Sequence, residues 1–259
     1  MDKNNTNKRI RILIGLVIFI VCLGLLLDRY NPPRVSKKRQ APESAISIYY
    51  QGKTWEEQGQ DDKALEAFKR SIQLDPNIGK VHTMLGVVYT NKGRFKEAEN
   101  EYRTALQLNM DEANKTITHH NLGILYLEGM GLYDKAIAEY EASIKMSPKP
   151  VLSSADSYCG LAKAYLAKID YEKAISEAQK SIEFNPEPQK GYAVLGEAYL
   201  QKKDIESARG VYEKLKDLDE DLAEELDANI KTEEEASSQL QELTASGCFE
   251  KKTINNPYI

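Results

Sequence analysis

Two patterns of hydrophobic and polar residues divide the chain. The first is an unbroken apolar run, "ILIGLVIFIVCLGLLL", which covers residues 12–27 without a charge. The second begins near residue 45, where small, aromatic and polar residues return in a fixed order until about residue 222. The first pattern predicts a single apolar helix. The second predicts a series of helix pairs built from one repeating unit.

The repeating unit is defined by columns of equivalent residues. A small residue opens the pattern in each unit: Gly52, Gly86, Gly123, Ala162 and Gly196. Three residues later comes a large ring: Trp55, Tyr89, Tyr126, Tyr165 and Tyr199. An alanine follows the small residue after 12 or 13 positions: Ala64, Ala98, Ala136, Ala174 and Ala208. Four residues after the alanine stand Phe68, Tyr102, Tyr140, Ala178 and Tyr212, and seven after it stand Ser71, Ala105, Ser143, Ser181 and Leu215. Three prolines close units one, three and four: Pro76, Pro148 and Pro186.

Taken together, these columns resemble the tetratricopeptide repeat, a helix-turn-helix unit of 34 residues. The resemblance implies an all-α fold, a right-handed α-solenoid of about five units. The units cover residues 45–78, 79–112, 116–150, 155–188 and 189–222. A glycine inside a helix costs about 1 kcal/mol relative to alanine. We therefore expect compensation from the second helix of each unit, approaching the glycine at its alanine.

Departures from the family pattern predict local irregularity. Met110 and Glu220 stand where proline is expected, and Ala178 replaces a ring. One extra residue lies in the turn of unit three, within "LEGMGLYDKA", and further residues separate units two, three and four. These changes predict altered curvature around the third unit.

The apolar run predicts a membrane anchor. Its sixteen residues make about 24 Å of helix at roughly 1.5 Å per residue, and its flanks extend it toward the roughly 30 Å of hydrocarbon. We predict a basic tail at residues 1–9, a transmembrane helix at residues 10–30 and a proline-containing basic linker at residues 31–44. A cleaved signal peptide is the competing interpretation, but no A-x-A-like site follows the run.

The orientation of this anchor follows from its flanking charges. Four Lys or Arg precede the span and five follow it, so the positive-inside rule gives almost a tie. A short basic tail tends to stay in the cytoplasm, so we favour a single-pass protein whose body lies on the exocytoplasmic side, periplasmic or extracellular. The opposite orientation would lay "SKKRQ" against an anionic inner leaflet.

The C-terminal region is acidic. Leu222, Leu226 and Ile230 form a helical stripe, so residues 223–246 are predicted to be a helix that caps the open end of the solenoid. Between Asp217 and Glu242 there are eleven acidic residues and one basic residue. An acidic docking segment therefore remains the alternative. Residues 247–259 are predicted to be a flexible tail.

Charge and composition exclude several functions. The net charge of −5 combines +6 in residues 1–44 with −11 in the rest, and no basic stripe with interleaved aromatics is present. Nucleic acid is therefore excluded as a main partner. Three distant cysteines, Cys22, Cys159 and Cys248, exclude a disulfide framework and a self-contained zinc module. No nucleophile–base pair, phosphate loop or metal-ligand spacing is present, so we predict no catalytic residue, no cofactor, no metal and no enzymatic activity.

His119 and His120 are the one pair that suggests a metal. Adjacent helical residues point about 100° apart and cannot both hold one ion from a single turn. In the repeat frame, His119 occupies a packing position, together with His82. His120 falls in a column that faces the inner surface of tetratricopeptide proteins. We therefore predict one packed and one groove-lining histidine.

The resemblance also implies a partner-binding groove along the first helices of the units. Its predicted residues are Tyr49, Tyr50, Lys53, Thr83, Met84, Val87, His120, Asn121, Ile124, Lys163, Val194 and Glu197. Asn121 matches an asparagine that many family members use to hold a peptide backbone. A bond only to water or to its own helix is the alternative. The apolar middle of the groove suits a protein or peptide segment with hydrophobic anchors.

The predicted function is a membrane-anchored scaffold or assembly factor. Its body would hold a partner segment in the groove, and residues 10–30 would span the lipid bilayer. Similar anchored proteins serve in envelope or membrane-complex biogenesis. The alternative is an auxiliary subunit of a stable membrane complex, which would use its convex face and its acidic C-terminal helix.

Overall fold

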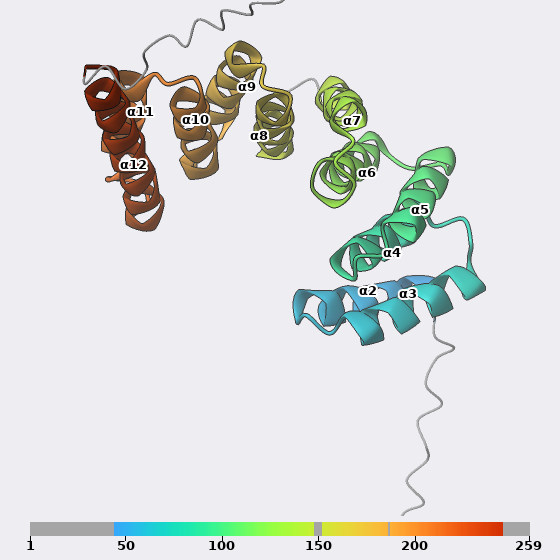
Figure 1. The fold of residues 1–259 in the computed structure, drawn as a ribbon. Helices are drawn as coiled ribbons and strands as arrows, with labels where there is room; N and C mark the ends of the chain where they lie inside the picture. Colours follow the sequence, from blue (N-terminus) through green and yellow to red (C-terminus); the bar gives the residue numbers. More distant parts are fainter. Residues whose placement is uncertain (1–43, 148–151, 186, 246–259) are drawn as a thin grey trace, which may run out of the picture. The chain divides into compact units, whose positions relative to one another are not determined.

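A computed structural model describes residues 44–147, 152–185 and 187–245. Across these ranges the chain forms eleven α-helices and one short π-helix, and it contains no strand (Figure 1). All described residues belong to one compact unit that begins at Ser44. The predicted tail 1–9, membrane helix 10–30 and nearly all of the linker 31–44 lie outside the described residues, as does the tail 247–259. No helix in the described ranges has the length and apolarity that a membrane crossing requires.

The helices alternate between the first and second members of successive hairpins. The first members are α2 (Ala45–Glu57), α4 (Gly79–Asn91), α6 (Glu112–Ile124), α8 (Leu152–Ala167) and α10 (Gln189–Gln201). The second members are α3 (Asp61–Leu74), α5 (Phe95–Gln107), α7 (Tyr133–Met146), α9 (Tyr171–Phe184) and α11 (Ile205–Leu215). The π-helix η1 (Leu125–Gly129) extends α6, and α12 (Glu220–Ala245) closes the series.

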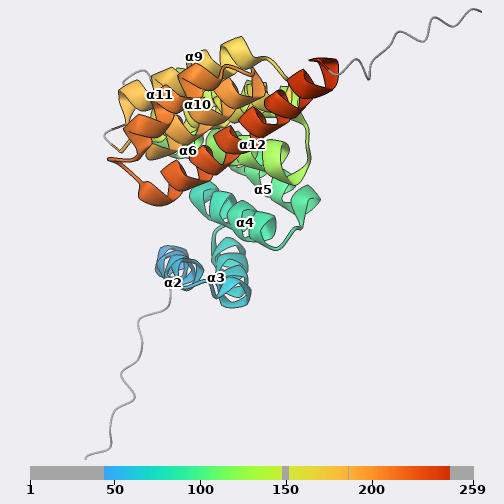
Figure 2. The ribbon, with the colours of Figure 1, turned by 60° about the vertical axis from the view of Figure 1, so that its left-hand side comes forward.

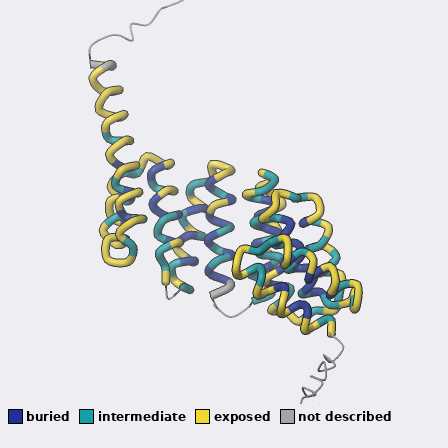
Figure 3. Tube along the Cα trace, turned by 90° about the horizontal axis from the view of Figure 1, so that it is seen from below, coloured by how far each residue is buried: buried dark blue, intermediate teal, exposed yellow. Residues whose placement is uncertain are grey.

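Contacts between these helices follow the order of the chain. Each first helix packs against its own second helix, and each second helix packs against the first helix of the next hairpin. Two apolar clusters fill the interior, one from Tyr49 to Ala164 and the other from Cys159 to Ile230. Burial is concentrated where helices face each other, and the outward turns are exposed (Figure 3). The predicted all-helical solenoid is therefore confirmed for the described residues.

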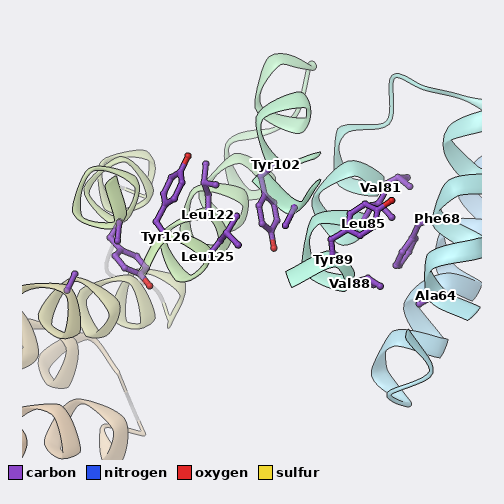
Figure 4. Close-up of a cluster of buried hydrophobic side chains, with 14 of the residues drawn as sticks. Ala64, Phe68, Val81, Leu85, Val88, Tyr89, Tyr102, Leu122, Leu125 and Tyr126 are labelled. Carbon is purple, nitrogen blue, oxygen red and sulfur yellow. The ribbon is translucent and has the colours of Figure 1, made fainter. Parts of the chain in front are cut away.

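The glycines of the repeat make room for the rings of the second helices. A methyl group placed on Gly52 would lie 2.7 Å from Phe68, and one on Gly86 would lie 2.6 Å from Tyr102. Figure 4 shows these two rings lying between their helices. In units one to three the closest neighbour of the glycine is thus the ring four residues after the alanine, rather than the alanine that we expected, and in unit five the closest neighbour of Gly196 is Leu226. The missing side chain is replaced by an aromatic one, which offsets the conformational cost of glycine.

Unit four uses a different solution at the same two positions. Ala162 stands where the other units have glycine, and Ala178 stands where units one to three have a ring. Both alanines are fully buried. A methyl group is tolerated at the first position because no ring occupies the second. The two departures from the family pattern therefore compensate each other.

The turns within the hairpins share one backbone conformation. The residue seven or eight positions after the small residue has a positive φ in every unit: Gly59, Gly93, Gly131, Ile169 and Lys203. The next amide donates to the carbonyl of the ring column, as in Gln60 N–H to Trp55 at 2.8 Å and Asp170 N–H to Tyr165 at 3.0 Å. This pattern ends the first helix as a Schellman motif does.

Replacing Ile169 by glycine is expected to stabilise the protein by about 1 kcal/mol. The β-branched Ile169 has φ 63° and is 71% exposed, so it bears left-handed strain without burying its side chain. Urea unfolding followed by circular dichroism measures the gain. Ile169→Ala is the control, because it removes the branch but keeps Cβ. An equal gain in both variants would show that the backbone conformation is not the cause.

The extra residue of unit three is absorbed by η1. In the other units the amide after the turn bonds five residues back, whereas Leu132 N–H bonds six residues back to the Tyr126 carbonyl, at 2.7 Å. A π-helix accommodates one additional residue within a helix. The two helices of this hairpin, α6 and α7, keep the pairing found in the other units, as a recurring serine bond shows.

That bond joins the two helices of a hairpin at the end opposite the turn. The hydroxyl of Ser71 donates to the carbonyl of Ala45 at 2.7 Å, and that of Ser181 donates to Ala155 at 2.9 Å. Both pairs are 26 residues apart. Ser143 donates to Thr116 at 3.0 Å over 27 residues, which allows for the inserted one. The serine column thus adds a cross-helix hydrogen bond to a backbone carbonyl near the start of three first helices.

Candidate partner-binding surface

The first helices of the hairpins form a continuous row. Contacts join α2 to α4, α4 to α6, α6 to α8, α8 to α10 and α10 to α12. All twelve predicted groove residues come from α2, α4, α6, α8 and α10. The long α12 lies beside α10 and α11 and continues the row beyond the fifth unit (Figure 2).

The predicted groove residues differ in burial. Four are exposed: Tyr50, Lys53, Lys163 and Glu197. Five are partly buried: Met84, Val87, His120, Asn121 and Ile124. Tyr49, Thr83 and Val194 are buried. The first two groups are open to a partner. Tyr49 and Thr83 pack between helices, and Val194 is only 4% exposed but lines a hollow between helices.

The buried members already have partners in the fold. The hydroxyl groups of Thr83 and Thr118 lie 2.7 Å apart and join α4 to α6. The ring of Tyr49 meets Phe68 at 6.1 Å between centroids. Val194 belongs to the second apolar cluster, together with Leu226 of α12. The positions of these three residues within the repeat unit did not show that neighbouring helices would cover their side chains.

An aromatic and cationic group lies at the α2 end of the row. Tyr50 is 58% exposed, and its ring stands edge-on to that of Tyr49, at 5.1 Å between centroids. The ammonium group of Lys80, from α4, lies 4.7 Å from the Tyr49 ring and 5.3 Å from the Tyr50 ring. Lys53 forms an exposed ion pair with Glu57 at 3.5 Å. This end can offer a ring face and cations to a partner.

The two adjacent histidines bind different elements. His119 Nδ1 lies 2.7 Å from a carboxylate oxygen of Glu139, on α7. His120 Nδ1 lies 3.0 Å from the Ser157 hydroxyl, on α8, and its ring packs 5.7 Å from that of Tyr140. Within the ranges that the structure describes, no three His, Cys, Asp or Glu side chains gather in a way that could hold a metal ion. The pair serves two helix contacts.

His82 is held by two acceptors. Its Nδ1 lies 2.7 Å from a Glu101 carboxylate oxygen, and its Nε2 lies 3.1 Å from the Pro76 carbonyl. Both ring nitrogens can donate only in the protonated form. The hydrogen bond to Glu101 raises the pKa of His82 above its ordinary value. Burial lowers the pKa of His120.

These opposite shifts predict opposite pH dependences. The raised pKa of His82 stabilises the fold fully below about pH 6.5, and this contribution is lost as the pH rises through the folded pKa. The lowered pKa of His120 reverses the sign, so its contribution is lost as the pH falls from about 6.5 through the folded pKa. An NMR titration should therefore give His82 a higher midpoint than His120.

Glu101→Gln is the control for this titration. Removing the carboxylate charge is expected to lower the titration midpoint of His82, because Glu101 of α5 pairs with this histidine. The midpoint of His120 should stay unchanged. Equal midpoints for the two histidines in the wild-type chain would contradict the prediction.

Asn121 has an amide available for a partner. Its side chain is partly buried on α6, and it forms no hydrogen bond with any residue that the structure describes. The alternative in which it bonds its own helix is therefore not adopted. An amide can donate and accept at once, which suits an extended backbone.

A hollow lies at the other end of the row. It has a volume of about 510 Å³, is open to solvent and is lined by α8, α10 and α12. Its lining residues are Lys163, Lys190, Ala193, Val194, Glu197, Leu200, Leu222, Glu225, Leu226 and Asn229. Three of these, Lys163, Val194 and Glu197, belong to the predicted groove. The structure therefore brings these three together, far along the row from Tyr50 and Lys53.

Sequence reasoning missed Lys190 and the residues that α12 contributes to this hollow. The stripe of Leu222, Leu226 and Ile230 predicted that α12 would dock, and Leu226 does pack at Gly196, where an added methyl would lie 2.7 Å away. The stripe could not show which polar residues of α12 would face α10. The reason is that α12 lies outside the repeat, so no column of equivalent residues fixes its position along α10.

Comparison with known proteins agrees with the fold. Profiles of the tetratricopeptide repeat match residues 45–78, 79–112, 120–188 and 159–223. Protein bimA of Emericella nidulans is 28% identical over 110 residues, which are 42% of this chain and only 13% of bimA. The chain thus spans a small part of that relative.

Two solved structures share the arrangement of helices. MamA (residues 41 to the end) from Desulfovibrio magneticus RS-1 has a TM-score of 0.58 at 22% identity, covering 68% of this chain and 96% of MamA. YrrB, described as a TPR protein with an unusual peptide-binding site, has a TM-score of 0.55 at 18% identity, covering 72% of this chain and 93% of YrrB. At these identities the likeness concerns the fold alone. With repeat profiles matching well over half of its length, the chain belongs to the tetratricopeptide repeat family.

Proposed function

We propose that the protein is a membrane-anchored scaffold that holds a segment of a partner protein along its row of first helices. Such a scaffold suits protein–protein interaction and needs no catalytic group. Residues 10–30 act as the anchor, and the body lies on the exocytoplasmic side. Tethering raises the effective concentration of a partner at the membrane, so the affinity of the surface itself can be modest.

One observation carries this proposal. Three residues expected in the groove, Lys163, Val194 and Glu197, line the same hollow of about 510 Å³, with an apolar floor and charged rims. Apolar pockets with a few polar groups are typical of sites that take an anchoring side chain. The free amide of Asn121 lies on the same row and can hold the backbone of the bound segment.

Crosslinking in native membranes followed by mass spectrometry tests the proposal. It identifies the partner, the face that it touches and its side of the membrane in one experiment. Crosslinks are expected on first helices, and partner peptides are expected to come from exocytoplasmic proteins. Crosslinks confined to the second helices, or no partner at all, would refute the groove assignment.

Substitutions in the row give the matching prediction. Asn121→Ala and Met84→Glu should each reduce partner capture about tenfold, because each removes or repels a contact at the centre of the interface. Circular dichroism should remain helical. Asn100→Ala, an exposed asparagine on α5, is the control and should capture the partner as the wild type does. Undiminished capture by both groove variants would count against the site.

A second candidate is an auxiliary subunit of a stable membrane complex. It is favoured by the distal part of α12, where the residues after Glu234 are exposed as far as the structure describes their side chains, and where Leu240 is an exposed apolar residue. Removing residues 236–259 leaves the buried contacts of α12 intact. Loss of co-purification in this truncation, together with retention in Asn121→Ala, would favour the second candidate.

A further inference from the structure

The hollow between α8, α10 and α12 is electrically uneven. On the α8 side stands Lys163, and Lys190 lies at the start of α10. On the α12 side stands Glu225. Between them, Val194, Leu200 and Leu226 make an apolar floor. Glu197, on α10, also lines the hollow, and its carboxylate accepts a hydrogen bond from the Gln201 amide at 2.9 Å. Among the other charged side chains, the sign changes from the two lysines to Glu225 on α12.

The two lysines lack carboxylate partners. Many lysines of the described residues form ion pairs, such as Lys202 with Glu172 at 3.3 Å and Lys180 with Glu177 at 2.8 Å. Neither Lys163 nor Lys190 pairs with any carboxylate in the described part of the chain, and the same is true of Glu225 for cations. Two lysines and one glutamate without ion pairs thus line one hollow that has an apolar floor.

We propose that this hollow receives one large apolar side chain of an extended partner segment, whose neighbouring carboxylate meets Lys163 and Lys190 and whose neighbouring cation meets Glu225. This inference rests on the proposed function and names the chemistry of the partner. It also makes α12 one wall of the binding site, in addition to its role as a cap.

The size of the hollow limits the spacing of the recognised residues. Two interaxial steps of about 8–10 Å separate α8 from α12, and side chains reach inward from both helices. An extended chain advances about 3.3 Å per residue. The carboxylate and the cation therefore lie about three to five residues apart, with the apolar residue between them.

Synthetic peptides test this pattern with the full-length chain in detergent. The probes are fluorescein-labelled dodecapeptides in a Gly-Ser background that carry Glu-x-Phe-x-Lys or Lys-x-Phe-x-Glu. Both charge orders are used because the partner segment can run in either direction along the hollow. Control peptides replace Phe by Ser, or carry two like charges. Fluorescence anisotropy should show that one of the mixed-charge peptides binds about tenfold more tightly than its controls.

Charge reversal in the protein gives the sharper arm. Lys163→Glu combined with Lys190→Glu should weaken the preferred peptide about tenfold. Adding Glu225→Lys should transfer the preference to the peptide with the opposite charge order. Lys214→Glu, an exposed lysine on α11 without an ion pair among the described residues, is the matched control and should change nothing.

Three results would overturn the inference: equal binding of all charge orders, no binding by any peptide, or dimerisation of the chain that Lys163→Glu abolishes. The last would place a second copy in the hollow. If crosslinked partners remain sensitive to Asn121→Ala while the peptides fail, only this inference falls. If both fail, the proposed function falls with it.

Discussion

Replacing Tyr140 by alanine will lower the free energy of unfolding by about 3–5 kcal/mol. The ring is only 1% exposed and lies against two glycines from successive units. Added methyl groups would stand 2.7 Å from it at Gly123 and 2.5 Å from it at Gly160. No smaller side chain can fill both spaces, so the substitution leaves a cavity where units three and four meet.

Urea unfolding followed by circular dichroism measures this loss, and Tyr133→Ala provides the control. Tyr133 lies on the same helix but is 39% exposed, so its removal should cost no more than about 0.5 kcal/mol. Because Tyr140 joins two units of a repeat array, its loss should also broaden the transition or split it. Equal destabilisation by the two variants would contradict the role assigned to the ring.

Replacing Ile230 by alanine is expected to cost about 2–5 kcal/mol. Ile230 is fully buried in the second apolar cluster and, with Leu226, fixes α12 to the end of the stack. The ion pair between Arg209 and Glu234, at 2.7 Å, is exposed and contributes little. The attachment of α12 therefore depends mainly on its apolar stripe.

Leu240→Ala is the matched control on the same helix. Leu240 is 58% exposed, so its substitution should leave the unfolding midpoint unchanged. Hydrogen exchange should show faster exchange in α10 and α11 of Ile230→Ala and unchanged exchange in α2 and α3, because contacts pass only between neighbours. Uniform acceleration along the chain would contradict this arrangement.

The sequence was sufficient to predict the hairpins, because the columns that define them are also the residues that pack. Gly86 and Tyr102 appear at a fixed spacing in the chain, and they touch in the fold. The exposure of groove residues was harder to predict. Thr83 is buried against the next unit, where its hydroxyl forms a hydrogen bond with that of Thr118, 35 residues later. The alignment of equivalent positions within one repeat unit does not show such a neighbour.

The hollow beside α12 lay beyond the repeat pattern for a related reason. Lys190 and Glu225 reach it from helices whose mutual register depends on how Leu226 fits over Gly196. That fit is set by the shapes of two particular side chains. Spacing in the sequence predicts which helices meet, but not how far one slides along the other.

The π-helical segment Leu125–Gly129 has a consequence for how this protein tolerates change in length. Its wider coil takes in a residue without moving the Ser143 bond to Thr116, which lies at the opposite end of the same hairpin. An extra residue at this place therefore leaves the packing of the later helices unchanged. The π-helix of unit three thus allows the chain to be one residue longer while the helices on either side keep their relative positions.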